Sequence, residues 1–142
     1  IFIKKKFFVN NNVFDENFFL QFDDTDLCWR LKKQKRDLFI VTEAKVKHLE
    51  GESHQKKFDF ELKKEVWWHN GWSHIYLAKK HFKKKDLIFL IIKKLFTSLF
   101  KSIGSLFVFK IQYSFLYFMN VSGIICSLLN TKSFYRSKIN QN

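Results

Sequence analysis

All acidic residues of the chain lie at or before Asp86, and this uneven distribution of charge constrains its fold more than any other feature. Up to that point the chain holds 19 basic and 13 acidic side chains, whereas the rest holds seven basic and no acidic ones. The later sequence consists of apolar clusters separated by lysines, such as Leu95 to Phe100. A chain of 142 residues is long enough for one domain and an appendage. We therefore expect two parts, residues 1–82 and residues 83–142.

Composition excludes several classes of protein. With 46% apolar and 27% charged residues the chain is not intrinsically disordered, and with no proline it is neither collagen-like nor proline-rich. The two cysteines, Cys28 and Cys126, lack CxxC or Cys/His ligand spacing, so we expect neither a disulfide framework nor a zinc module. The lysines lie among aliphatic clusters and match no known nucleic-acid-binding pattern, so nucleic acid is not an expected partner.

The second part has the pattern of a membrane-associated segment. A run of three lysines at residues 83–85 precedes it, as basic clusters do beside membranes. Ile111 to Asn130 is uncharged but contains several polar residues, so it makes a poor span, whereas Lys94 and Lys101 suit an amphipathic helix. We expect interfacial attachment rather than spanning. An alternative stays open, in which these helices cover the apolar face of another domain.

The first part predicts mixed secondary structure. Acidic residues followed by basic ones suit a helix dipole, and short apolar runs indicate buried strands. The expected elements are a helix from about Asp26 to Gln34 capped by Asp24, Thr25 or Asp26, strands at Leu38 to Val41 and Ala44 to His48, a loop around Gly51, and a helix from about Lys56 to His81 weakened by Gly71. This order predicts an α/β or α+β fold.

Three neighbouring aspartates are the first candidates for chemistry. Asp23, Asp24 and Asp26 stand at the start of the predicted helix, and crowding of carboxylates raises the pKa of at least one of them. One could act as a general base; alternatively, one caps the helix and the others are solvated. His48 ends a predicted strand beside a loop, which suits a metal ligand, a general base or a structural residue. The other histidines lack ligand spacing and are interpreted as surface or packing residues.

The sequence around these aspartates resembles a motif of a known family. The segment from Phe14 to Arg30 is similar to the FDExFFLYxEDxDLCxR segment of family 2 glycosyltransferases, especially their rhamnosyltransferase-like branch. The similarity continues through the predicted strands, through HLEGES at residues 48–53 for HxxGxS, and through residues 73–81 for SxxYxxKKH. It covers about residues 1–82. In the tail, Gly123 and SFYR at residues 133–136 resemble the branch's usual ending, which is commonly basic, apolar and membrane-associated.

This resemblance implies the C-terminal part of a GT-A fold. Such enzymes transfer a sugar, with inversion, from a nucleotide-diphosphate donor to a hydroxyl acceptor, here a cell-surface polysaccharide or lipid-linked glycan. It also implies a divalent cation, Mg²⁺ or Mn²⁺, and a place at the cytoplasmic face of the cell membrane, peripheral or tail-anchored. The family's nucleotide-binding half precedes the matching segment. We therefore expect the chain to be the C-terminal portion of a transferase, inactive by itself; the alternative is a non-catalytic module that binds a membrane surface.

The same resemblance assigns roles to residues. Asp24 aligns with the catalytic base, Asp23 with the acidic position that orients it, and His48 with a ligand of the metal. Asp26 is expected to cap the helix. Three aromatic residues could line the acceptor side or pack in the core: Phe18, Phe19 and Trp29.

Departures from the family pattern are few. Asn12 and Val13 replace a Gly-Gly pair, which predicts a different entry turn because valine disfavours positive φ. Asp23 replaces the commoner glutamate, and Thr42 stands where a proline usually follows the strand. Neither of these last two changes affects the expected chemistry.

Overall fold

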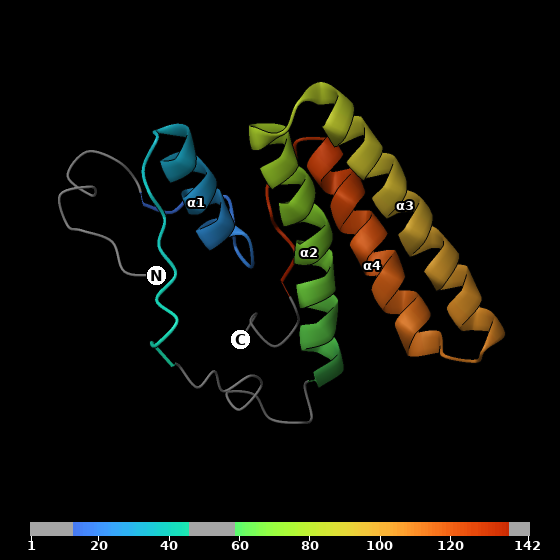
Figure 1. Cartoon of the computed structure of the whole chain (residues 1–142). Coiled ribbons are helices and arrows are strands. Elements are labelled where there is room, and N and C mark those ends of the chain that lie inside the picture. Colours follow the sequence, from blue (N-terminus) through green and yellow to red (C-terminus); the bar gives the residue numbers. More distant parts are fainter. Residues whose placement is uncertain (1–12, 46–58, 137–142) are drawn as a thin grey trace.

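All regular structure in the described residues is helical. The computed structural model describes residues 13–45 and 59–136. Its helices are α1 (Asp23–Lys33), α2 (Asp59–His81), α3 (Lys84–Phe107) and α4 (Ile111–Leu128) (Figure 1). Since these ranges contain no strand, the predicted α/β class and the GT-A fold are wrong for this chain.

The strand predicted at Leu38 to Val41 is the clearest local error. These residues form an irregular segment after α1, with Phe39 85% and Ile40 91% exposed. An apolar run becomes a strand only when a neighbouring strand pairs with its backbone, and the described part of the chain offers none. The strand predicted at Ala44 to His48 and the loop around Gly51 lie almost entirely outside the described residues.

Both predicted helices of the first part exist. α1 begins at Asp23, three residues earlier than expected, so that all three aspartates stand in its first turn, while Arg30, Lys32 and Lys33 stand in its last. The N-cap residue is Phe22, with φ 68°, and no side chain caps the helix. The capping role predicted for Asp26 is therefore wrong. The helix predicted up to His81 is confirmed as α2 from Asp59 onward.

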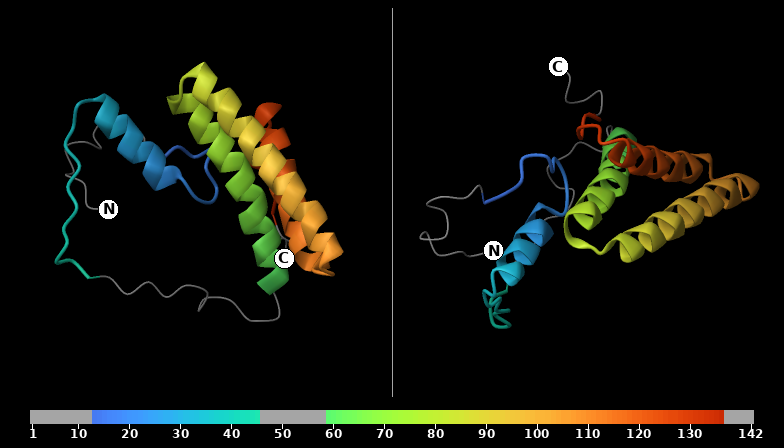
Figure 2. Two further views of the ribbon diagram at one scale, coloured as in Figure 1. Left: turned by 45° about the vertical axis from the view of Figure 1, so that its right-hand side comes forward. Right: turned by 90° about the horizontal axis from the view of Figure 1, so that it is seen from above.

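Helices α2, α3 and α4 form an up-down-up arrangement in which α4 packs against both of the others. α2 and α4 run parallel and make the most extensive contact. α3, which connects them in the chain, runs in the opposite direction and packs mainly on α4. α1 lies on the other side of α2 (Figures 1 and 2). The core holds Trp68, Trp72, Ile75, Ala78, Leu116, Met119 and Ile124. The apolar second part of the sequence thus completes the core around α2.

Two glycines set the distance between α2 and α4. A Cβ atom at Gly71 would lie 2.2 Å from the backbone oxygen of Asn120, and one at Gly123 would lie 2.1 Å from that of Trp68. Real Cβ atoms do not come so close, so the two backbones are in contact because neither residue has a side chain. Gly71, which weakens the helix by propensity alone, is required for packing.

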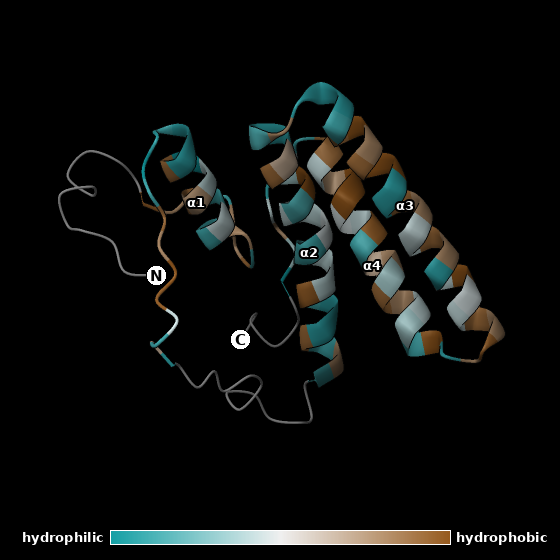
Figure 3. Cartoon of the chain, in the orientation of Figure 1, coloured by the Kyte–Doolittle hydropathy of each residue, from teal (hydrophilic) through white to brown (hydrophobic). Residues whose placement is uncertain are grey.

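The outward face of α3 is apolar from Phe89 to Phe107. An apolar stripe with helical spacing covers it, and the side chains of the stripe are between 54% and 81% exposed: Phe89, Ile92, Phe96, Phe100, Ile103 and Phe107. Figure 3 shows the hydropathy of the residues along α3. At a rise of 1.5 Å per residue the 24 residues of α3 extend about 36 Å. The inward face supplies Ser98 to the protein interior. α3 therefore exposes its apolar face on the protein surface, whereas the polar Ser98 faces the interior.

Among the described helices, α4 is the candidate for a membrane span by length and composition. The window from Ile111 to Leu128 has a mean hydropathy of 1.3, and 44% of it is buried inside the protein. A core helix of a soluble protein passes the same test, and α4 packs as a core helix here.

Candidate functional site

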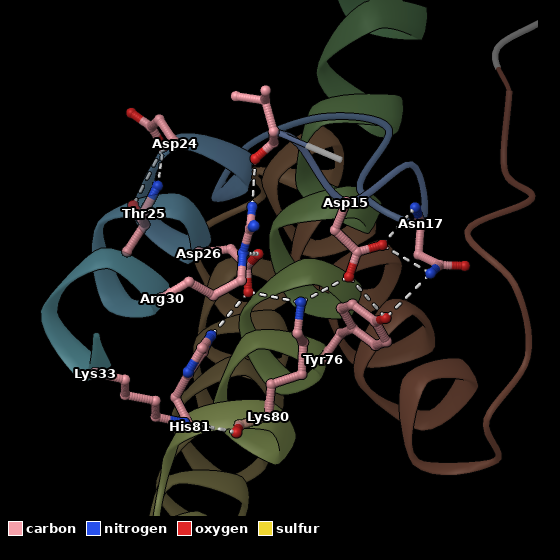
Figure 4. A network of polar contacts seen from close by, with 11 residues as sticks. Asp15, Asn17, Asp24, Thr25, Asp26, Arg30, Lys33, Tyr76, Lys80 and His81 are labelled. Carbon is pink, nitrogen blue, oxygen red and sulfur yellow. Dashed lines mark hydrogen bonds and ion pairs between the residues drawn. The ribbon is translucent and has the colours of Figure 1, made fainter. Parts of the chain in front are cut away.

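The structure separates the three aspartates of α1 by their surroundings. Asp26 is completely buried, and its carboxylate accepts hydrogen bonds from Arg30 at 2.8 Å, from Lys80 at 2.7 Å and from Nε2 of His81 at 2.7 Å (Figure 4). Burial alone would raise the pKa of Asp26, but these contacts outweigh it and lower the pKa. Asp26 is therefore an ionised residue that joins α1 to the end of α2.

Asp15 extends this network toward the loop before α1. Lys80 lies 2.7 Å from its carboxylate and so bridges Asp15 and Asp26, while the Tyr76 hydroxyl donates to Asp15 at 3.0 Å. Burial would raise the pKa of Asp15, but the hydrogen bonds from Lys80 and Asn17 outweigh it and hold the pKa at about 2. Arg30 also donates to the backbone oxygen of Val13. The loop, α1 and α2 are thus joined through charged side chains.

This network consists mainly of residues from two sequence segments, residues 14–30 and residues 73–81. Asp15 and Asp26 belong to the segment from Phe14 to Arg30, and three further members belong to residues 73–81: Tyr76, Lys80 and His81. Sequence reasoning missed the network because it treated each segment separately. The signal that could have revealed it was the opposite charge of acids in residues 14–30 and bases in residues 73–81. His81, interpreted as a surface or packing residue, holds Asp26 with a side chain that is 3% exposed.

Asp24 has a different environment. It is exposed at the start of α1, and its Oδ1 accepts hydrogen bonds from the backbone nitrogen of Thr25 at 2.6 Å and from the Thr25 hydroxyl at 3.2 Å. Figure 4 shows its side chain turned away from Asp26 and the network. Asp23 precedes it, half-buried. Asp24 is therefore accessible to a substrate from solvent, whereas Asp26 is not.

A cavity of about 650 Å³ opens beside the network. It is lined by the loop before α1, by Arg30 and Lys80, and by Lys132, Ser133 and Arg136 of the segment after α4. The guanidinium of Arg136 lies 3.4 Å above the centre of the Phe19 ring, which fixes that segment against the loop. Asp24 does not line this cavity, so the predicted base and this cavity are separate features.

The predicted metal site cannot be assembled from the described residues. His48 lies outside them, and no group of three His, Cys, Asp or Glu side chains in the described ranges could hold a metal ion. Two other histidines are packed. His69 is buried with Nε2 2.8 Å from the backbone oxygen of Tyr135, and burial and nearby Lys94 lower the pKa of His74 to about 4.

The three aromatic candidates for an acceptor surface differ. Phe18 is 8% exposed and packs edge-on against Tyr76, so it is a core residue. Phe19 and Trp29 are 42% and 38% exposed; Trp29 stacks on His81 at 5.6 Å between ring centres. Both are partly available at the surface near the network.

Comparisons with known proteins add no assignment. No protein-family model, no curated protein and no solved structure matches this chain.

Proposed function

We propose that this chain supplies the acceptor-side segment, with the catalytic base, of a family 2 glycosyltransferase. One observation carries the proposal. In the segment that resembles the family's base-carrying motif, Asp24 is exposed at a helix N-terminus and stands outside the ion pairs, whereas Asp15 and Asp26 are held within them. The residue that aligns with the base is therefore an accessible one.

In the proposed reaction, Asp24 takes the proton of an acceptor hydroxyl. The hydroxyl oxygen attacks the anomeric carbon of a nucleotide-diphosphate sugar, the bond from that carbon to the diphosphate oxygen breaks, and the configuration inverts. Asp23 lies beside the base and would orient it. A divalent cation, Mg²⁺ or Mn²⁺, would neutralise the leaving diphosphate. The described residues do not form a site for that cation, so no step is assigned to it.

The helical fold limits what the chain can do by itself. The described residues contain no sheet on which a nucleotide could bind, so the residues that hold the donor would lie outside the described ranges. The acceptor would be a hydroxyl of a cell-surface polysaccharide or of a lipid-linked glycan.

Asp24→Asn is expected to abolish sugar transfer, by about a hundredfold or more, because asparagine cannot accept the proton. The measurement is transfer from radiolabelled nucleotide sugar by the protein with its native flanking sequence, with donor affinity measured separately. Donor affinity should not change. A matched control is Asp37→Asn, the same substitution after α1, which should leave transfer intact. Retained turnover in the Asp24 variant would refute the assignment.

A second candidate function is binding to a membrane surface, favoured by the apolar stripe on α3. The helix begins at the lysine run of residues 83–85, and Lys93 is exposed beside the stripe. A helix with an exposed apolar face and flanking lysines binds in the interface of an anionic bilayer. This would place the protein at the cytoplasmic membrane face, with α3 in the plane of the membrane.

The double variant Phe96→Glu/Phe100→Glu is expected to weaken binding to phosphatidylglycerol vesicles by about tenfold or more, because two exposed rings of the stripe become charged. Vesicle flotation with the complete chain measures this. Phe39→Glu is the control, since its ring is more exposed and its segment lies on the other side of α2 from α3 (Figure 1). Equal binding by both variants would exclude the stripe as the membrane-binding surface.

A further inference from the structure

A polar cavity between α2, α3 and α4 contains cationic side chains and no acidic ones. It has a volume of about 330 Å³, and its polar lining comes from all three helices: Asn70, Lys94, Thr97, Ser98, Lys101, Tyr117 and Asn120. Lys94 is half-buried, and its Nζ has no hydrogen bond or ion pair among the described residues. Burial lowers the pKa of Lys94, with no acid nearby to oppose it. The cavity therefore holds the amino group of Lys94 with no carboxylate among its lining residues.

The amide oxygens around the cavity accept hydrogen bonds from neighbouring side chains, whereas several donor groups have no acceptor in the part of the chain that the structure describes. The Ser98 hydroxyl donates to Oδ1 of Asn120 at 3.1 Å, and Nδ2 of Asn120 donates to the backbone oxygen of Trp67 at 3.0 Å and to Oδ1 of Asn70 at 3.4 Å. The Tyr117 hydroxyl has no partner among the described residues. Two ammonium groups and a phenol thus remain as donors, which is the arrangement that an anion requires.

A second hollow continues from the first one along α3 and α4. It measures about 720 Å³, and two residues, Lys101 and Tyr117, line both cavities. Most of its other lining residues are apolar or small, namely Phe100, Gly104, Val108 and Tyr113, and the remaining two are Ser105 and Lys110. A Cβ atom at Gly104 would meet nothing within 4 Å, so this groove is open where that residue lies. A cationic cavity therefore adjoins an apolar groove.

We propose that this pair of cavities binds a phosphate ester of an apolar chain, with the phosphate at Lys94 and Lys101 and the chain in the groove between α3 and α4. The phosphate supplies the counter-ion that Lys94 lacks, and the apolar chain covers the rings of Phe100, Tyr113 and Tyr117. The site does not require that the protein transfer sugar. It rests on the side chains of three helices and stands apart from Asp24.

Calorimetry with decyl phosphate below its micelle concentration tests the site, with inorganic phosphate and decanol as separate probes. Decyl phosphate is expected to bind at least about tenfold more tightly than either part alone, because both cavities are then occupied. If inorganic phosphate binds as well as decyl phosphate, or if none of the three binds, the proposal is wrong.

Substitutions separate the two halves of the site. Lys94→Gln should weaken decyl phosphate binding by about tenfold or more, because glutamine has no positive charge to pair with the phosphate, and Lys94→Arg should retain binding, because arginine keeps that charge. Lys32→Gln is the control, because that lysine of α1 is exposed and lines neither cavity. Equal binding by Lys94→Gln and Lys32→Gln would overturn the proposal. Lys101→Gln is a second variant, on a more exposed residue, with the same expected loss.

Gly104→Leu tests the groove without touching the cationic cavity. The new side chain would fill the open space along α3, so decyl phosphate should bind about tenfold more weakly while inorganic phosphate binds as before. An unchanged affinity for decyl phosphate would refute the placement of the chain.

Two vesicle preparations distinguish the sources of the phosphate. Phosphatidylcholine vesicles are doped either with phosphatidylglycerol or with a long-chain prenyl monophosphate, and flotation of the wild type is compared with that of Lys94→Gln. A Lys94-dependent difference on the first identifies a bilayer phospholipid, and on the second a carrier-lipid phosphate. Flotation that is independent of Lys94 on both would contradict the proposal.

Discussion

Gly71→Ala is expected to destabilise the protein by about 3 kcal/mol or more, and Gly123→Ala by a similar amount, as measured by urea unfolding. Each added methyl group would overlap a backbone oxygen at 2.2 or 2.1 Å, and backbone cannot move aside as a flexible side chain can. The helices must separate instead. The core between α2 and α4, which includes Trp68 and Trp72, would lose contact along its whole length.

Gly104→Ala is the control for this prediction. The same substitution in α3 meets open space, so only helix propensity changes, and the variant should be more stable than the wild type by up to about 1 kcal/mol. The double variant Gly71→Ala/Gly123→Ala should cost less than the sum of the two, because one separation of α2 from α4 accommodates both methyl groups. Wild-type stability of either single variant would show that the helices are not in backbone contact.

Asp26→Asn is expected to cost about 3 kcal/mol of unfolding free energy. The substitution removes a buried negative charge that accepts hydrogen bonds from Arg30, Lys80 and His81, so these three side chains lose the carboxylate that joins α1 to α2. Asp24→Asn, two residues away in the same helical turn, should leave stability within about 0.5 kcal/mol, because Asp24 is exposed. Equal effects of the two substitutions would refute the structural role of Asp26.

The free energy of unfolding of the wild type and of Asp26→Asn should depend differently on pH. The folded pKa values of Asp15 and Asp26 lie below the ordinary value of 3.8, so the unfolded chain binds protons first as the pH falls. The contribution of Asp15 is therefore complete above about pH 4 and is lost as the pH falls toward 2, and the lowered pKa of Asp26 adds a loss of stability in the same direction. Unfolding of the wild type should become easier over that range. In Asp26→Asn the decrease should be smaller, because only Asp15 still contributes.

Candidate residues could be found from sequence only in part. The letters around α1 identified a group of aspartates, but crowding by itself could not say which one is ionised in a buried network and which is exposed. That distinction depends on Lys80 and His81, which are more than fifty residues from Asp26 in sequence and reach it only when α2 lies beside α1. The cationic cavity was missed for the same reason, since Lys94 was interpreted only as part of an amphipathic pattern.

The sequence by itself determined where helices form in this chain. Acidic residues followed by basic ones predicted α1, and the apolar clusters separated by lysines predicted helices in the second part, because these properties depend on neighbours within a few residues. Tertiary structure decided the rest. The run from Leu38 to Val41 stays irregular because a strand needs a distant partner, and α4 became the core partner of α2 because Gly71 and Gly123 allow their backbones to meet.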